Sequence, residues 1–162
     1  EVFGVFKAYC TRVGSGPFPT EQENETGNLI REKGHEYGST TGRPRRCGWL
    51  DLVALKYSIM INGVSQLFMT KADVLTGFDI VKVCTGYKCK GHITEQLPDD
   101  LYKVDSAEYV EFRGWSNDVS QIKIESDIPE NLQKYIRFIE KETGIPVTIV
   151  SLGPNRKQII LR

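Results

Sequence analysis

The residues best suited to chemistry lie in one stretch between positions 38 and 49. Two glycines bracket a Ser-Thr-Thr run, and three arginines follow within four positions. Hydroxyl groups can donate hydrogen bonds to oxyanions, and a guanidinium binds carboxylate or phosphate through parallel N–H groups. Burying three unpaired guanidinium groups would be very costly, so this stretch does not suit a packed core. It predicts an anion-binding loop, and the alternative is a solvated basic loop without a ligand.

The elements that must position this loop follow it in the chain. Residues 49–61 are apolar almost all round, which predicts a buried helix that anchors the loop from its C-terminal side. Asp51 in the first turn suits the positive end of the helix dipole, and Asn62-Gly63 ends the helix. The loop is therefore expected to rest on a core element.

Alternating and apolar patterns divide the rest of the chain into short strands and two further helices. Helices are expected at 26–33, ended by Gly34, and at 129–143, ended by Gly144. The turns at 71–73 and 151–154 follow predicted strands, and open α/β sheets bind ligands at the carboxyl ends of their strands. His35 and His92 are assigned no chemistry. Strands are expected at 2–10, 65–70, 80–90, 109–113, 145–150 and 158–161.

Composition limits the kinds of partner. The chain has 162 residues, the size of one domain, with 21 basic and 21 acidic side chains. This balance argues against a general nucleic-acid binder, so an anion site must be local. No apolar run approaches the ~20 residues of a membrane span. Cysteines at 10, 47, 84 and 89 favour thiols in a reducing cytosol over a disulfide or metal framework. The chain starts on glutamate rather than methionine, so it is expected to be cut from something longer.

Three motifs carry a resemblance to a known family. Residues Gly38–Asp51 resemble the aspartate-binding loop of the adenylosuccinate synthetases, and the likeness continues in Thr11–Glu21 and Thr70–Leu75. It covers essentially all 162 residues, in order, as the C-terminal portion of a much longer enzyme. The implied fold is α/β, part of a larger mixed-sheet nucleotide-binding enzyme with flanking helices and ligand loops at strand ends.

The resemblance also implies an activity. The family joins IMP to L-aspartate at the expense of GTP, with Mg²⁺, and gives adenylosuccinate, GDP and phosphate in AMP biosynthesis. The full-length enzyme is expected to be a cytoplasmic homodimer, without nucleic-acid or membrane partners. The phosphate loop, the catalytic groups and the Mg²⁺ ligands belong to the part of the family that precedes this sequence. The segment is therefore expected to hold no catalytic residue and no metal ligand, and to be inactive alone.

The resemblance assigns binding roles residue by residue. Val13 and Arg43 would contact IMP, and Arg45 would reach both the aspartate and the GTP. Family members often have leucine where Ala72 stands, so the apolar cover of the base is expected to be thinner here. The aspartate carboxylates would be held by Ser39, Thr40, Thr41, Gly42, Arg43, Pro44 and Arg45, and the guanine pocket would consist of Lys71, Ala72, Asp73, Ser151, Leu152 and Gly153.

Two alternative functions come from other classes of protein. The first is a stand-alone guanine-nucleotide-binding module without ligase activity, which would use the Thr-Lys-x-Asp turn at residues 70–73. The second is an RNA-binding domain that uses the arginine loop. The zero net charge and the lack of a basic face interleaved with aromatic residues argue against RNA.

Overall fold

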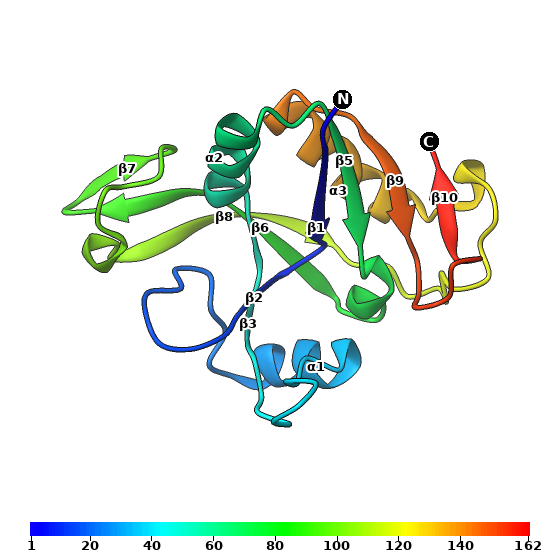
Figure 1. The fold of residues 1–162 in the computed structure, drawn as a ribbon, viewed down its shortest axis with the longest axis horizontal. Helices are drawn as coiled ribbons and strands as arrows, with labels where there is room; N and C mark the ends of the chain where they lie inside the picture. The colour runs from blue at the N-terminus through cyan, green and yellow to red at the C-terminus, as the bar shows by residue number, and fades with distance from the viewer. The chain divides into compact units, whose positions relative to one another are not determined.

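The computed structural model describes residues 1–162, which form a mixed α/β fold (Figure 1). Its contacts divide the chain into two compact units, each made of stretches that are discontinuous in sequence. The first unit comprises Glu1–Ala8, Leu55–Val81 and Glu111–Arg162, and the second comprises Tyr9–Ala54 and Lys82–Val110. No single linker therefore separates the units.

A four-stranded sheet forms the centre of the first unit. Its order is β1 (Phe3–Lys7), β5 (Gln66–Thr70), β9 (Val147–Ser151) and β10 (Ile159–Leu161). β1, β5 and β9 run parallel, and β10 returns antiparallel at one edge (Figure 1). The predicted strands at 65–70, 145–150 and 158–161 are confirmed, and the sheet is mixed, as the family resemblance implied.

Helix α3 (Glu130–Thr143) belongs to the same unit and confirms the helix predicted at 129–143. Gly144 ends it in the left-handed conformation, with φ of 71°. The Tyr135 hydroxyl donates a hydrogen bond to the Ala8 carbonyl at 2.7 Å, so the helix is tied to the chain just after β1. Its apolar face consists of Leu132, Tyr135, Ile136 and Ile139, all fully buried.

The helix that follows the arginine stretch differs from the prediction. Helix α2 (Leu52–Asn62) starts later than expected, because the preceding residues form the short strand β4 (Leu50–Asp51), which pairs in parallel with β6 (Ile80–Cys89). Only the first two residues of α2 are buried, whereas Met60 is 68% exposed and Ile61 is 60% exposed. The prediction of a buried helix is therefore wrong beyond its first turn. A helix that is apolar on every side needs cover on every side, and this chain covers only the first turn of α2.

The second unit contains a small antiparallel ladder. β2 (Cys10–Arg12) pairs with β3 (Arg46–Gly48), and α1 (Glu25–Gly34) packs against β3. The strand predicted at 2–10 is in fact two strands in different sheets, because the chain bends at the buried residues Ala8 and Tyr9.

The end of α1 corrects the role expected of Gly34. His35, not Gly34, takes the left-handed conformation after the helix, with φ of 49°. Gly34 is the last helical residue, and a Cβ there would lie 2.3 Å from the hydroxyl oxygen of Tyr9. The predicted boundary holds within one residue, but the glycine is needed for close packing rather than for a positive φ.

A second sheet of the chain joins β4, β6, β7 (His92–Thr94) and β8 (Ser106–Arg113). The strands predicted at 80–90 and 109–113 are confirmed, and the turn between β6 and β7 has positive φ at Lys90 and Gly91. No helix of this chain is both long and apolar enough to cross a bilayer. Short 3-10 turns occur at Ala72–Leu75, Leu101–Lys103 and Glu125–Asp127.

Candidate functional site

The predicted anion-binding loop is an exposed, self-closed turn in the second unit. A bridge pairs Tyr37 with Pro44, the Gly38 N–H donates to the Arg43 carbonyl at 2.8 Å, and the Gly42 N–H donates to the Gly38 carbonyl at 2.8 Å. Gly42 has φ of 64°, a conformation that favours glycine. The side chains at positions 39–44 are exposed. The hydroxyl run and the Arg43 guanidinium are therefore open to a ligand while the loop backbone closes on itself.

Arg45 is held more firmly than the rest of the loop. Its Nη1 donates to Oε2 of Glu36 at 2.6 Å, and the Tyr9 hydroxyl donates to Oε1 of the same carboxylate at 2.6 Å. Glu36 is fully buried, whereas the Arg45 side chain remains 32% exposed. Arg31 Nε donates to the Arg45 carbonyl at 2.8 Å and fixes the backbone as well. Sequence reasoning did not identify Glu36 or Tyr9, because nothing in the local pattern indicates that this glutamate is buried.

The third arginine of the cluster has a structural role. Arg46 makes a two-pronged ion pair with Glu21, through Nε to Oε1 at 2.8 Å and through Nη2 to Oε2. Its Nη1 donates to the Gly16 carbonyl at 2.8 Å and to the Gly14 carbonyl at 3.2 Å. The hydrogen bonds to Glu21 raise the pKa of the Arg46 guanidinium above its usual value. Arg46 is thus held by a carboxylate and two carbonyl groups of the protein.

Val13 lies at the end of the ladder that carries the arginines. β2 and β3 pair Arg12 with Arg46, so Val13 and Arg45 are the next residues beyond the last pair. Val13 is 79% exposed. The ladder therefore brings two residues with predicted ligand roles to one end of the same pair of strands.

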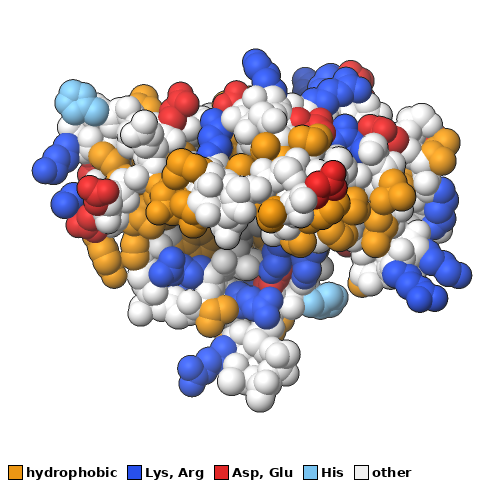
Figure 2. Space-filling model, turned by 45° about the horizontal axis from the view of Figure 1, so that its top comes forward, with side chains coloured by type: hydrophobic (Ala, Val, Ile, Leu, Met, Phe, Trp, Pro, Cys, Tyr) orange, Lys and Arg blue, Asp and Glu red, His pale blue; other side chains and the backbone are white.

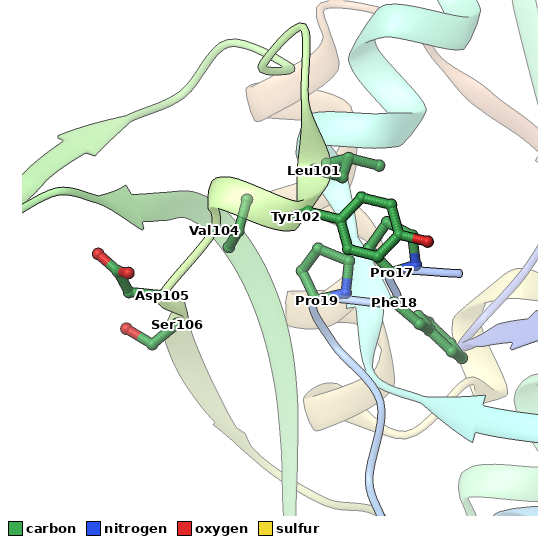
Figure 3. A pocket seen from close by; sticks show the side chains of 8 residues that line it. All are labelled: Pro17, Phe18, Pro19, Leu101, Tyr102, Val104, Asp105 and Ser106. Atoms are coloured by element: carbon green, nitrogen blue, oxygen red, sulfur yellow. The ribbon is translucent and has the colours of Figure 1, made fainter. Parts of the chain in front are cut away.

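A cavity of about 330 Å³, lined by both apolar and polar residues, lies beside the loop that Arg46 holds. In Figure 3 the Tyr102 ring lies beside Pro17 and Pro19, whereas Asp105 and Ser106 point away from them. None of the residues with a predicted ligand role lines this cavity. It is separate from the predicted aspartate loop.

The two segments of the predicted guanine pocket lie in the first unit, at one edge of its sheet. β5 and β9 are parallel neighbours, so the turns that follow Thr70 and Ser151 leave the sheet at the same edge. Lys71 takes the left-handed conformation, with φ of 60°, and the 3-10 turn Ala72–Leu75 follows it and contacts β9. The structure thus brings together two segments that are about eighty residues apart in the chain.

The side chains of these two segments differ in accessibility. Ala72 and Leu152 are fully buried, so their contribution to a ligand would come from the backbone. The Ser151 hydroxyl donates to the Gly153 carbonyl at 2.9 Å, and a Cβ on Gly153 would lie 2.3 Å from the Gln158 amide oxygen. A side chain at position 153 would therefore have to displace the Gln158 amide.

Asp73 is half-buried and is the acidic residue of the predicted guanine pocket. Burial raises the pKa of its carboxyl above the usual value, while nearby backbone N–H groups and Lys71 act in the opposite direction. The Thr76 N–H donates to the Asp73 carbonyl at 3.0 Å. An acceptor with few solvent contacts is well suited to discriminate between ring N–H donors.

Metal-ligating side chains do not gather in this chain. No group of three or more His, Cys, Asp or Glu side chains is placed to hold a metal ion. The four cysteines are present as thiols.

Comparisons with known proteins agree over nearly the whole chain. The family description for adenylosuccinate synthetase matches residues 1–160. The adenylosuccinate synthetase of Parabacteroides distasonis is 54% identical over 162 residues, covering 100% of this chain and 38% of that protein. That of Bacteroides fragilis is 51% identical, with the same coverage of both proteins.

A solved structure shares the fold. It is that of a fully ligated adenylosuccinate synthetase from Plasmodium falciparum, which superposes with a TM-score of 0.95 at 42% identity and covers 99% of this chain and 39% of that one. The chain thus spans somewhat over a third of the length of its relatives. With the family matched from residue 1 to residue 160, the chain belongs to the adenylosuccinate synthetase family.

Proposed function

We propose that this chain is the C-terminal part of a ligase that joins IMP and L-aspartate, with conversion of GTP to GDP and phosphate, to give adenylosuccinate. The observation that carries the proposal is the exposed Ser-Thr-Thr-Gly-Arg loop in a chain that belongs to this family over residues 1–160. In this reaction GTP phosphorylates the oxygen on C6 of IMP. The aspartate amine then displaces that phosphate.

In this proposal the second unit holds the aspartate and approaches IMP. The two aspartate carboxylates need several donors, and the loop offers hydroxyl groups, backbone N–H groups and two guanidinium groups. Holding both carboxylates orients the amine for attack, which is the main way that binding residues accelerate a displacement. The aspartate loop consists of Ser39, Thr40, Thr41, Gly42, Arg43, Pro44 and Arg45, with Val13 and Arg43 on the IMP side.

The first unit would hold the guanine of GTP. Asp73 would accept the hydrogen bonds of the base, and the neighbouring turn after β9 would close the pocket. The shared sheet edge of β5 and β9 supports this part of the proposal. Arg45 would reach the GTP from the aspartate loop. The pocket consists of Lys71, Ala72, Asp73, Ser151, Leu152 and Gly153.

The remaining machinery would lie outside this chain. A phosphoryl transfer needs charge neutralisation around the γ-phosphate, usually by a phosphate-binding loop and Mg²⁺. The chain has no glycine-rich phosphate loop with its lysine, and its carboxylates do not form a cation site. We therefore propose that another part of the enzyme holds Mg²⁺ and the catalytic groups. A cytoplasmic homodimer as the working form rests on the family alone.

An exposed apolar edge also supports a longer enzyme. β1 is an edge strand of its sheet, and Phe3 and Val5 are 49% and 66% exposed. A cavity of about 250 Å³ opens beside them and reaches Leu55 and Ile59. Hydrophobic side chains are visible at the molecular surface in Figure 2. Monomeric proteins usually protect such edges, so we infer that a further segment of the sheet covers β1.

The test compares a full-length synthetase that carries this segment with the segment alone. Both are purified from a host that lacks its own adenylosuccinate synthetase, and adenylosuccinate formation is measured with IMP, aspartate, GTP and Mg²⁺. We expect turnover by the full-length protein and none by the segment. Turnover by the segment would contradict the proposal that the catalytic groups lie outside this chain. A full-length protein that folds but is inactive would favour a guanine-nucleotide-binding module.

A further inference from the structure

Two carboxylates of this chain are buried, and one of them faces the ligand loop. Glu36 is 0% exposed and Asp51 is 5% exposed. A buried carboxylate is very costly unless each oxygen has a partner. Glu36 meets this need with the Tyr9 hydroxyl on Oε1 and Arg45 Nη1 on Oε2, both at 2.6 Å. Its position therefore requires an explanation that involves Arg45.

The backbone reinforces the same pair. The Arg45 N–H donates to the Glu36 carbonyl at 2.9 Å, and the Glu36 N–H donates to the Arg31 carbonyl at 2.9 Å. Arg31 in turn donates through Nε to the Arg45 carbonyl at 2.8 Å. Arg31, Glu36 and Arg45 thus join the end of α1 to the end of the loop. These hydrogen bonds fix the backbone of Arg45, and the ion pair with Glu36 fixes the direction of its side chain.

Arg43 provides the contrast within the same loop. Its side chain is exposed and has no ion pair or hydrogen bond in this structure. A free arginine side chain loses its rotamer freedom when it binds a ligand. Arg45 has already lost that freedom to Glu36, while about a third of its side chain stays accessible. Ligand binding should therefore cost Arg45 less side-chain conformational entropy than it costs Arg43.

We propose that Glu36 is a positioning residue, which holds the Arg45 guanidinium in its binding orientation and is itself oriented by Tyr9. The proposal rests on the proposed function, because it assumes that Arg45 contacts a substrate anion. A preorganised donor binds more tightly than a mobile one, since fewer side-chain states are lost on binding. Glu36 touches no substrate and acts only through Arg45.

A double-mutant cycle separates this role from simple support of the fold. Glu36→Ala, Arg45→Ala and the double variant are made in the full-length synthetase, and the KM values for aspartate and GTP are measured at saturating IMP. In the wild-type background we expect Glu36→Ala to raise at least one of the two KM values about 10-fold. In the Arg45→Ala background the same change is expected to alter that KM less than about 2-fold.

Conservative variants test the hydrogen-bond pattern. In Glu36→Gln the amide oxygen can still accept from Arg45, and the amide N–H₂ can donate to Tyr9 if the phenol hydroxyl rotates. We therefore expect Glu36→Gln to restore most of the KM that Glu36→Ala loses. Glu32→Ala, at an exposed glutamate near the end of α1, is the control and should leave both KM values unchanged.

The outcomes test the ligand role of Arg45 separately from the positioning role of Glu36. If Arg45→Ala leaves both KM values unchanged, the proposed ligand role of Arg45 is wrong. If Arg45→Ala matters but Glu36→Ala raises KM equally in both backgrounds, Glu36 acts on the fold and the positioning role is wrong. Thermal unfolding of every variant is measured in parallel, and Glu36→Gln with wild-type Tm but the KM of Glu36→Ala would also contradict the proposal.

Discussion

The buried carboxylate of Asp51 accepts a hydrogen bond from the Tyr87 hydroxyl at 2.5 Å, and its other oxygen accepts the Ala54 N–H at 3.1 Å. Asp51 thus caps the start of α2 and also links this helix to Tyr87 of β6. Burial is the larger influence and raises the pKa of the Asp51 carboxyl, although both hydrogen bonds act in the opposite direction. Burial and the neighbouring Asp51 also raise the pKa of Tyr87, so the phenol stays protonated as a donor.

This pair predicts a pH dependence of stability. Because the pKa of Asp51 is higher in the folded state, its stabilising contribution is fully present below the unfolded-state pKa of about 3.8. It is lost as the pH rises from there through the folded-state pKa. We expect the free energy of unfolding of the wild type, minus that of Asp51→Asn, to fall as the pH rises from about 4 towards neutrality. Urea unfolding of the two full-length enzymes at several pH values measures this difference, and a difference that rises with pH would contradict it.

Close packing at the end of α1 gives a second prediction. Gly34→Ala should destabilise the enzyme by roughly 1–3 kcal/mol, because its Cβ would lie 2.3 Å from the Tyr9 hydroxyl oxygen. Alanine is favoured over glycine in a helix by only about 1 kcal/mol, so the clash should win. Denaturant unfolding checks this, with the exposed Glu32→Ala as control. An unchanged or higher midpoint for Gly34→Ala would show that Tyr9 moves aside freely.

The sequence predicted most elements of this fold but not how they pack. Helix α3 has one apolar stripe between a proline and a glycine, and its bounds came out as expected. Residues 49–61 are apolar almost all round, and such a run does not distinguish a strand from a helix, so β4 was missed.

The same limit applies to the candidate site. The loop residues could be identified because glycines, hydroxyls and arginines are dense there. Glu36 could not, because a buried charge depends on Tyr9 and Arg45, and Tyr9 lies 27 positions away in the chain. Arg46 resembled its neighbours in sequence, and only the fold shows that Glu21 binds it.

Thiol reactivity supplies a third prediction. Cys84 is fully buried, and burial together with the nearby Asp51 raises the pKa of its thiol to about 12. At pH 8 only about one molecule in ten thousand would carry the thiolate, which is the reactive form. We expect iodoacetamide to leave Cys84 unmodified in the folded enzyme and to label it after denaturation. Peptide mass analysis locates the label, and rapid labelling of Cys84 in the folded enzyme would contradict its burial.

Arg43 is the exposed guanidinium of the loop, and its removal should chiefly weaken aspartate binding. A charge-assisted hydrogen bond to a carboxylate contributes roughly 1.5–3 kcal/mol. Arg43→Leu in the full-length enzyme should therefore raise the apparent KM for aspartate by about one to two orders of magnitude. Arg46→Leu is the informative comparison. It should lower the stability of the enzyme, because it removes the ion pair with Glu21. An unchanged aspartate saturation curve for a folded Arg43→Leu enzyme would show that the loop has another role.

We propose that Asp73 selects guanine over other bases. Guanine presents two neighbouring donors, the N1–H and the 2-amino group, and an ionised carboxylate accepts from both. Xanthine keeps the N1–H but has a carbonyl in place of the amino group, which an asparagine amide can satisfy. A site built on polar pairing rejects an analogue that leaves its own groups unpaired.

The most direct measurement is therefore steady-state kinetics of full-length wild type and Asp73→Asn with GTP and with xanthosine triphosphate. We predict that Asp73→Asn lowers kcat/KM for GTP and raises it for xanthosine triphosphate, while KM for aspartate stays within about 2-fold. If the variant only loses stability and keeps the wild-type preference between the two nucleotides, Asp73 caps the turn at Ala72–Leu75 and guanine binds elsewhere.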